Sequence, residues 1–171
     1  MLFSSYCFYF RSQDTTTKYF WSTSPSVNEL FSSNLRPSLI KSAEIDENRD
    51  GKNERIEINV EVPLLSSESI RSIEALVFHE TILHDKARYQ FDSVSHIKIS
   101  NSDSIASAVS DGRLLFIQTW PLYARGGYQT PYASDPLLDL SPAALTVPLS
   151  SSEIDFSSIL NNYFSRNCNL L

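Results

Sequence analysis

The sequence predicts a mainly β fold, an antiparallel β-sandwich with one C-terminal amphipathic helix packed against it. Several segments carry apolar residues at every second position, which is the spacing of half-buried strands. A single segment near the end carries them at helical spacing, and serine-rich connections separate the segments. The length of 171 residues suits one domain, so we assign residues 1–171 to a single β domain.

The strands follow from these patterns in chain order. Aromatic residues fill residues 1–10 and recur at 18–21, and residues 56–62 alternate apolar and polar side chains until Pro63. Further strands are expected at residues 73–78 and 89–99, the latter with an irregularity near Ser93, where the alternation changes phase. The Asp111-Gly112 pair predicts a turn before a buried strand at residues 113–120. Pro148 would keep a strand at residues 146–149 on an edge.

Two helices are expected. Ser24 and Pro25 are typical of a helix start and predict a short helical turn over residues 25–31. The terminal helix follows a loose capping box, and its apolar stripe predicts a packing face. We expect one buried cluster that joins strand and helix faces: Ile56, Ile58, Val60, Val77, Phe116, Phe156, Ile159, Leu160 and Phe164.

Charge and composition exclude several classes of protein. The chain has 14 basic and 20 acidic residues, a net charge of -6, which does not suit binding to nucleic acid. Its 4 glycines form no phosphate-binding loop. The 2 cysteines, Cys7 and Cys168, form no metal or redox motif; we expect free thiols, and a pairing between them stays open. The printed chain shows neither a signal-peptide pattern nor an apolar run long enough to span a membrane.

An acidic segment at residues 46–57 has the spacing of a calcium-binding loop. Oxygen-bearing side chains stand at Asp46, Asn48, Asp50, Glu54 and Glu57, with Gly51 at the sixth place. However, Asn53 replaces the usual aliphatic anchor, and Glu57 falls within a strand pattern that leaves no room for an exit helix. The other interpretation is a solvated turn closed by Asp and Asn side chains. No other cofactor is expected.

Catalytic motifs find no support in the sequence. His79 and His84 are one residue too far apart for HExxH and would lie on opposite faces of a strand, while His96 stands alone. No GxSxG is present, and paired carboxylates occur only in the acidic segment. Residues 120–140 combine prolines, a Gly126-Gly127 pair and aromatics. That composition fits either a binding surface or a cover for one end of the fold.

Two segments together carry a resemblance to a known family. YFWSTSP at residues 19–25 followed by Asn28-Glu29-Leu30, and the acidic segment with its Asp-x-Asn-x-Asp-Gly-Lys core, resemble the transmembrane protein 231 family. The segment EVPL at residues 61–64 extends the match, which is looser over residues 73–79 and the terminal helix. The combination is specific, whereas either segment alone would be weak.

The resemblance implies an ectodomain held between two membrane helices, without catalytic residues. Members of this family lie in the ciliary transition zone and ciliary membrane, in a Meckel-syndrome-type complex with B9-domain, tectonic and other small transmembrane proteins. There they serve cilium assembly and the gate that controls the entry of membrane proteins. Since neither helix is present in this sequence, the resemblance implies truncation at both ends and membrane attachment only through the missing helices.

Two hypotheses follow, of different classes. The first is a structural and interaction component of the ciliary gate, as the resemblance implies. The alternative is a calcium-dependent β-sandwich binding module, which rests on the spacing of the acidic segment. A truncated sheet would leave strand edges uncovered, so we also expect the isolated chain to aggregate or to need a partner strand.

Overall fold

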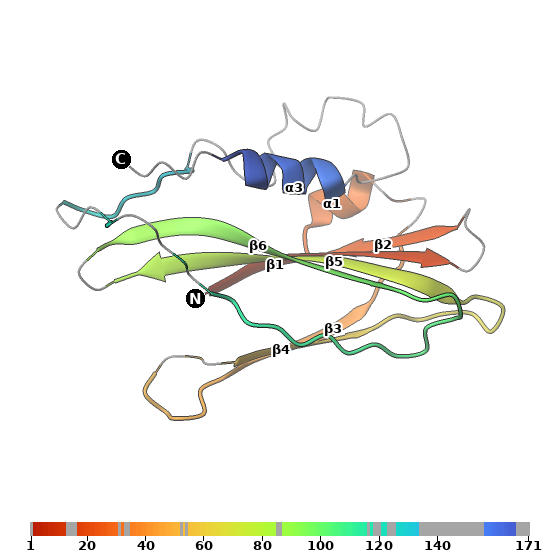
Figure 1. Ribbon diagram of the computed structural model, residues 1–171. Coiled ribbons are helices and arrows are strands. Elements are labelled where there is room, and N and C mark those ends of the chain that lie inside the picture. Colours follow the sequence, from red (N-terminus) through yellow and green to blue (C-terminus); the bar gives the residue numbers. More distant parts are fainter. Residues whose placement is uncertain are drawn as a thin grey trace.

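A computed structural model describes most of the chain (Figure 1). The described residues are 2–12, 17–30, 32, 35–51, 53, 55–84, 87–115, 117, 121–122, 126–133 and 156–166.

Antiparallel strands make up the body of the molecule. One sheet contains β1 (Leu2–Ser12), β2 (Lys18–Ser22), β5 (Ile70–Leu83) and β6 (Tyr89–Ser100) in the order β2-β1-β5-β6. A second, two-stranded sheet is the hairpin of β3 (Leu39–Ile45) and β4 (Arg55–Glu61). The helices α1 (Pro25–Leu30) and α3 (Phe156–Ser165) lie on the side of the larger sheet opposite the hairpin (Figure 1).

The core forms around β5, which lies between β1 and β6 and is covered on both faces. Five consecutive residues of β5, from position 75 to 79, are buried, and Leu76 is fully so. On the hairpin side, a buried cluster of apolar residues contacts apolar side chains from the hairpin and the adjoining strands. Its buried members are Phe10, Tyr19, Ile70, Ala75 and Val77. Ile40, Ile58 and Val60 supply the hairpin side of this contact, so alternate hairpin positions close the core from below.

The expected mainly β fold with antiparallel pairing is confirmed, as is the short helix at Pro25. The second layer is smaller than we expected for a sandwich, because the hairpin that forms it has only two strands. The irregularity expected near Ser93 is wrong, because β5 and β6 pair in one continuous register from Ser72↔Ser100 to Leu83↔Tyr89. The change of phase arises because Val94 faces the helix side, opposite Phe78, while Phe91 and Ile97 face the hairpin side.

The buried strand expected at residues 113–120 is also wrong where the structure describes it. Leu114 and Leu115 are 48% and 66% exposed and lie in no strand. Of the expected core, Val77 is buried and Ile58 and Val60 are partly buried against its cluster, whereas Phe164 is 76% exposed. The expectation of one cluster that joins the hairpin and the terminal helix is wrong, because the larger sheet lies between the hairpin and α3 (Figure 1). Phe116 and residues 146–149 lie outside the described residues. The strand β3 was not expected, because exposed Ser42 and Glu44 break the apolar alternation that begins at Ile40.

Candidate functional site

A polar corner, defined by Ser22, Ser24 and Asn28, joins β2 to α1. The side chain of Asn28 uses both of its polar atoms on the backbone of Ser22. Its Oδ1 accepts the Ser22 N–H at 2.9 Å, and its Nδ2 donates to the Ser22 carbonyl at 2.7 Å. The Ser22 hydroxyl accepts the Ser24 N–H at 3.1 Å. Because Ser22 is only 1% exposed, these bonds satisfy backbone groups that water does not reach.

The same corner starts the helix and anchors it. Ser24 precedes α1, and its carbonyl accepts the first helical bond, from the Asn28 N–H at 3.1 Å. Pro25 occupies the first helical position, where no N–H is needed. Val27 is buried at 2% exposure. The WSTSP segment and the following Asn28 therefore turn the chain from an edge strand into a helix that lies over the sheet.

A second polar cluster, the Tyr19–Arg36–Glu68 clamp, ties three distant segments together. The guanidinium of Arg36 donates to Glu68 Oε1 at 2.7 Å and lies 4.6 Å from the centroid of the Tyr19 ring. The Arg36 backbone N–H donates to the carbonyl of Phe20 at 2.9 Å, and Glu68 Oε2 accepts the Leu65 N–H at 2.8 Å. The clamp thus links β2, the approach to β3 and the turn before β5.

The clamp shifts the proton affinities of two of its members. The hydrogen bond from Leu65 is the main cause that lowers the pKa of Glu68; burial opposes it, and contacts with Tyr19 and Arg36 lower the pKa further. Burial and the neighbouring Glu68 raise the pKa of the Tyr19 hydroxyl. At neutral pH the carboxylate is therefore charged and the phenol neutral, so the clamp pairs one cation with one anion.

The acidic segment forms the turn of the β3–β4 hairpin. Asp46 Oδ1 and Oδ2 accept the backbone N–H groups of Asp50 and Gly51 at 3.2 and 2.9 Å, and Asn48 Oδ1 accepts the Asp50 N–H at 2.9 Å. Arg49 and Gly51 have positive φ angles of 59° and 84°. These contacts match the interpretation of a solvated turn closed by its own Asp and Asn side chains.

The calcium ligands expected from the sequence are divided between this turn and β4. Both oxygens of Asp46 already accept backbone bonds, and Glu57 lies in β4, where its Oε1 is 3.2 Å from Arg55 Nη2. Glu54 lies outside the described residues. In the part of the chain that the structure describes, no three His, Cys, Asp or Glu side chains gather as metal ligands would. Calcium binding by Asp46, Asn48, Asp50, Glu54 and Glu57 stays a prediction.

The three histidines occupy separate environments. His79 Nε2 is 2.8 Å from Ser95 Oγ on the hairpin side of the sheet, and burial lowers its pKa. His96 Nε2 is 2.8 Å from Glu74 Oε1 on the helix side, and Glu74 also lies 3.6 Å from Lys98. His84 contacts the Tyr128 hydroxyl. The rings do not converge on one point, so they do not form a common metal or catalytic centre.

The described part of residues 120–140 is attached to the body of the fold. Gln129 donates its N–H to the Arg88 carbonyl at 2.9 Å, and its carbonyl accepts the Gln90 N–H at 3.0 Å. The guanidinium of Arg166, at the end of α3, lies 4.9 Å from the centroid of the Tyr132 ring. Residues 126–133 thus contact both the start of β6 and the end of the terminal helix. These contacts fit the covering role.

The fold and its polar contacts define an antiparallel β domain in which side chains fix the connections between strands. Residues 3–170 match the family model described as Transmembrane protein 231. The chain therefore belongs to the transmembrane protein 231 family. In the described residues, no helix combines the length and apolar character that crossing a bilayer requires.

Three relatives illustrate the match, each called "Transmembrane protein 231". The chain is 28% identical to the Bos taurus protein over 147 residues, 86% of this chain and 44% of that protein. It is 29% identical to the Xenopus tropicalis protein over 154 residues, 90% of this chain and 47% of that protein. It is 29% identical to the Mus musculus protein over 106 residues, 62% of this chain and 34% of that protein. The chain thus spans less than half the length of these relatives, and no solved structure matches it.

Proposed function

We propose that this chain is the ectodomain part of a non-enzymatic structural component of the ciliary transition zone. Its role would be to help build the gate that controls the entry of membrane proteins into the cilium. The observation that carries the proposal is the family match over residues 3–170. The resemblance of the YFWSTSP and acidic segments supports it, because both segments form turns that shape the domain.

The proposed role is to present surfaces to other proteins. In this view the hairpin and the larger sheet are two layers of a sandwich, held in place by the core cluster and the clamp. The partners would be the B9-domain, tectonic and small transmembrane members of the complex that the resemblance implies. Attachment to the ciliary membrane would come from helices that the family supplies outside this chain.

A chimaera tests the proposal. Residues 3–170 would replace the matching region of the mouse relative, with a fluorescent tag, in ciliated cells that lack the endogenous protein. We expect the chimaera to concentrate at the base of the cilium and to restore exclusion of membrane proteins. A uniform plasma-membrane signal, from a chimaera shown to be folded by limited proteolysis, would contradict the proposal.

Two variants make the result specific. Asn28→Ala breaks the polar corner at buried Ser22, and Asn48→Ala makes the same chemical change in the exposed hairpin turn. We expect Asn28→Ala to reduce the signal at the ciliary base and Asn48→Ala to leave it unchanged. Equal signals for both variants would mean that the shape of this domain does not matter to its localisation.

A further inference from the structure

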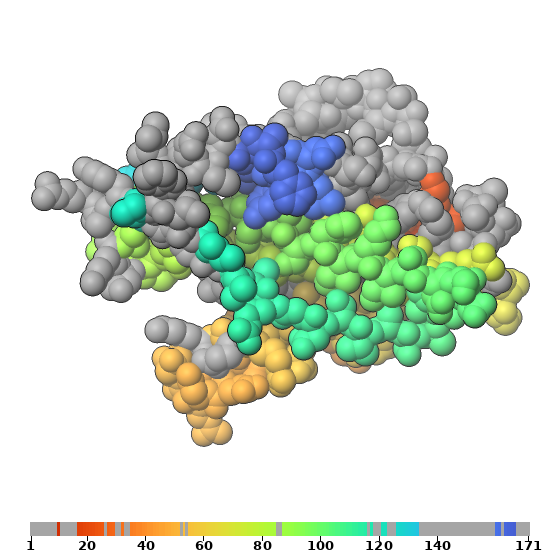
Figure 2. Space-filling model, viewed as in Figure 1, coloured from red at the N-terminus to blue at the C-terminus, as the bar shows by residue number. Residues whose placement is uncertain are grey.

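The strand β6 lies at the edge of the larger sheet. On the outer side of β6, Gln129 pairs with the first residues of the strand: the Gln90 N–H donates to the Gln129 carbonyl at 3.0 Å. Alternate residues of a strand direct their backbone groups to opposite sides, so those of Asp92, Val94, His96 and Lys98 point outward like those of Gln90. Among the described residues, no strand pairs with this stretch. Figure 2 shows β6, in green, at the visible surface.

We propose that this edge pairs with the same edge of a second copy of the chain, with Ser95 opposite Ser95 of the second copy. The two β6 strands would run antiparallel about a twofold axis, so one sheet would continue across both copies. This register brings outward-pointing backbone groups together, because Asp92 of one copy then faces Lys98 of the other, and Val94 faces His96 of the other. The inference goes beyond the proposed function and does not depend on a ciliary role.

Charge selects this register over its neighbours. Asp92 and Lys98 are both exposed, and Lys98 retains 59% side-chain exposure although it lies near Glu74. In the proposed register each Asp92 faces Lys98 of the second copy, which forms two opposite-charge pairs per dimer. A shift by one hydrogen-bonded pair would place His96 opposite His96 and Lys98 opposite Val94 and lose both ion pairs. Charges on an edge strand usually prevent pairing, but here they are arranged to favour one partner.

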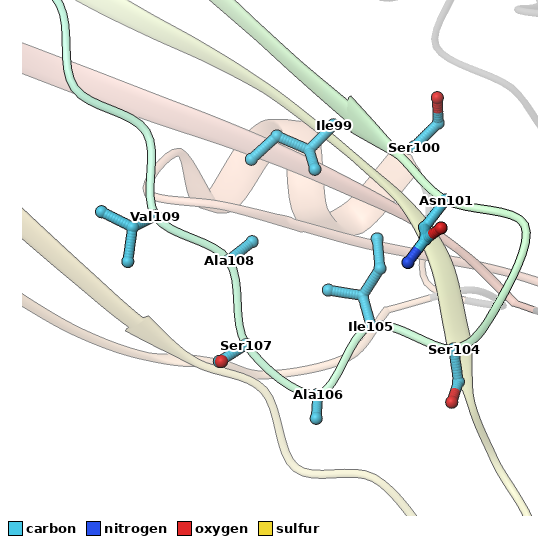
Figure 3. Close-up of a pocket in the computed structure, with 9 residues that line it drawn as sticks. All are labelled: Ile99, Ser100, Asn101, Ser104, Ile105, Ala106, Ser107, Ala108 and Val109. Carbon is cyan, nitrogen blue, oxygen red and sulfur yellow. The ribbon is translucent and has the colours of Figure 1, made fainter.

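Apolar groups meet on the other face of the paired strands. Phe91 would lie opposite Ile99 of the second copy, and both are half-buried in the single chain. Beside Ile99 is an open groove of about 440 Å³, with walls formed by the end of β6 and residues 104–109. In Figure 3 the side chains of Ile99, Ile105 and Ala108 point into this groove. An aromatic ring from the second copy would pack against these three apolar side chains, as anchors do in stable interfaces.

The wall of the groove is held in place by the backbone. Asn101 donates its N–H to the Arg71 carbonyl at 2.9 Å, and Ile105 donates to the Ile70 carbonyl at 2.6 Å. Both acceptors belong to the start of β5, so residues 101–105 stay close to the sheet. The groove therefore exists before pairing, which lowers the entropic cost of association.

Charge reversal tests the proposal on the purified chain. Light scattering after size exclusion, over micromolar to millimolar concentrations, would measure the dimer of the unchanged chain and of two variants, Asp92→Lys and Lys98→Asp. Each variant alone sets like charges opposite each other twice, so we expect a dissociation constant roughly tenfold higher or more. Asp111→Lys, which makes the same charge change outside β6, is the control and should dimerise normally.

Mixing the two charge variants tests the proposed register. An equimolar mixture of the two variants should form a heterodimer, seen by native mass spectrometry. Positions 92 and 98 are both basic in one variant and both acidic in the other, so each facing pair in the heterodimer joins opposite charges. The double variant Asp92→Lys/Lys98→Asp should recover the original dimer, and Phe91→Ala should weaken it with no rescue by charge. Circular dichroism would confirm that each variant is folded. A monomer at all concentrations, or dimers indifferent to these charges, would overturn the proposal.

Discussion

Two turns in this chain are closed by side-chain oxygens, and they differ in almost every other respect. At the polar corner, the Asn28 side chain bonds to the backbone of a residue that is 1% exposed. At the hairpin turn, the Asp46 carboxylate bonds to Asp50 and Gly51, all in solvent-exposed surroundings. The same chemistry thus serves a buried junction between two elements in one place and a local, exposed loop in the other.

The contrast shows that hydrogen-bond chemistry does not by itself set the contribution to stability. Where water can replace a lost bond, the loss costs little, whereas a buried N–H or C=O left without a partner costs its full desolvation. The corner also holds α1 over β2, so its loss affects packing as well. We therefore expect the two turns to respond very differently to equivalent substitutions.

The largest expected effect is at Asn28. Replacing it with Ala removes both bonds to Ser22 and should lower the free energy of unfolding by about 2–4 kcal/mol, because two hydrogen bonds to the backbone of a buried residue are lost. Urea denaturation followed by circular dichroism measures it. Asn48→Ala, the matched change in the hairpin turn, should cost less than about 0.5 kcal/mol, as exposed substitutions usually do. Similar losses at both positions would remove the distinction between the turns.

The next effect is expected at the clamp. Because the pKa of Glu68 is lowered on folding, its carboxylate stabilises the protein above its ordinary pKa of 4.5, and this contribution is lost as the pH falls through the folded value. Glu68→Gln should therefore lower the melting temperature at pH 7, by less than Asn28→Ala does. The difference from the unchanged protein should shrink as the pH falls below 4.5.

A double-mutant cycle measures how much of that effect comes from the ion pair. Once Arg36 is replaced by Gln, Glu68→Gln should have a smaller effect at neutral pH, since the 2.7 Å contact between the two is already absent while the bond from Leu65 remains. A loss that depends on pH but stays the same when Arg36 is replaced would show that Glu68 acts through its bond to Leu65 alone. The clamp would then be a local turn, like the one in the hairpin.

Sequence patterns predicted the elements of this fold better than the contacts between them. The strands around Ile58 and Val77 and the start of α1 follow local rules of alternation and capping, which a single sequence displays. The hairpin turn was predicted in the same way, because Asp46 and Asn48 bond to residues close by in the chain.

The remaining features depend on long-range packing. Nothing in the neighbourhood of Tyr19, Arg36 or Glu68 indicates that they meet, because their contact depends on how three segments are arranged. The apolar run at Leu114 and Leu115 predicted burial, yet burial requires a neighbouring element, and the described fold provides none for these two side chains. Local composition does not carry that information.

A smaller effect is expected from the backbone of the hairpin turn. Gly51 has a φ of 84°, and nothing lies within 4 Å of the position that an alanine methyl group would take, so Gly51→Ala meets no clash and should cost about 1 kcal/mol from left-handed strain alone. Arg49, at a φ of 59°, already bears that strain, and Arg49→Gly should change stability by less than about 0.5 kcal/mol, because relief of strain offsets the added freedom of the unfolded chain. Thermal melts of the two variants compare them. A larger loss for Arg49→Gly than for Gly51→Ala would contradict this account of the turn.

The smallest expected effect is that of calcium on this turn. An ion held at a hundred times its dissociation constant would raise the stability by about 2.7 kcal/mol, which a thermal melt detects easily. Binding would require Glu57, which lies in β4, to leave Arg55, and the described acidic side chains of this turn do not gather as a ligand set. We therefore expect the melting temperature to be the same in millimolar calcium as in a chelator. A saturable rise that Asp46→Ala abolishes and Asp111→Ala retains would instead support the calcium-binding alternative, and the exposed turn would then be the functional one of the two.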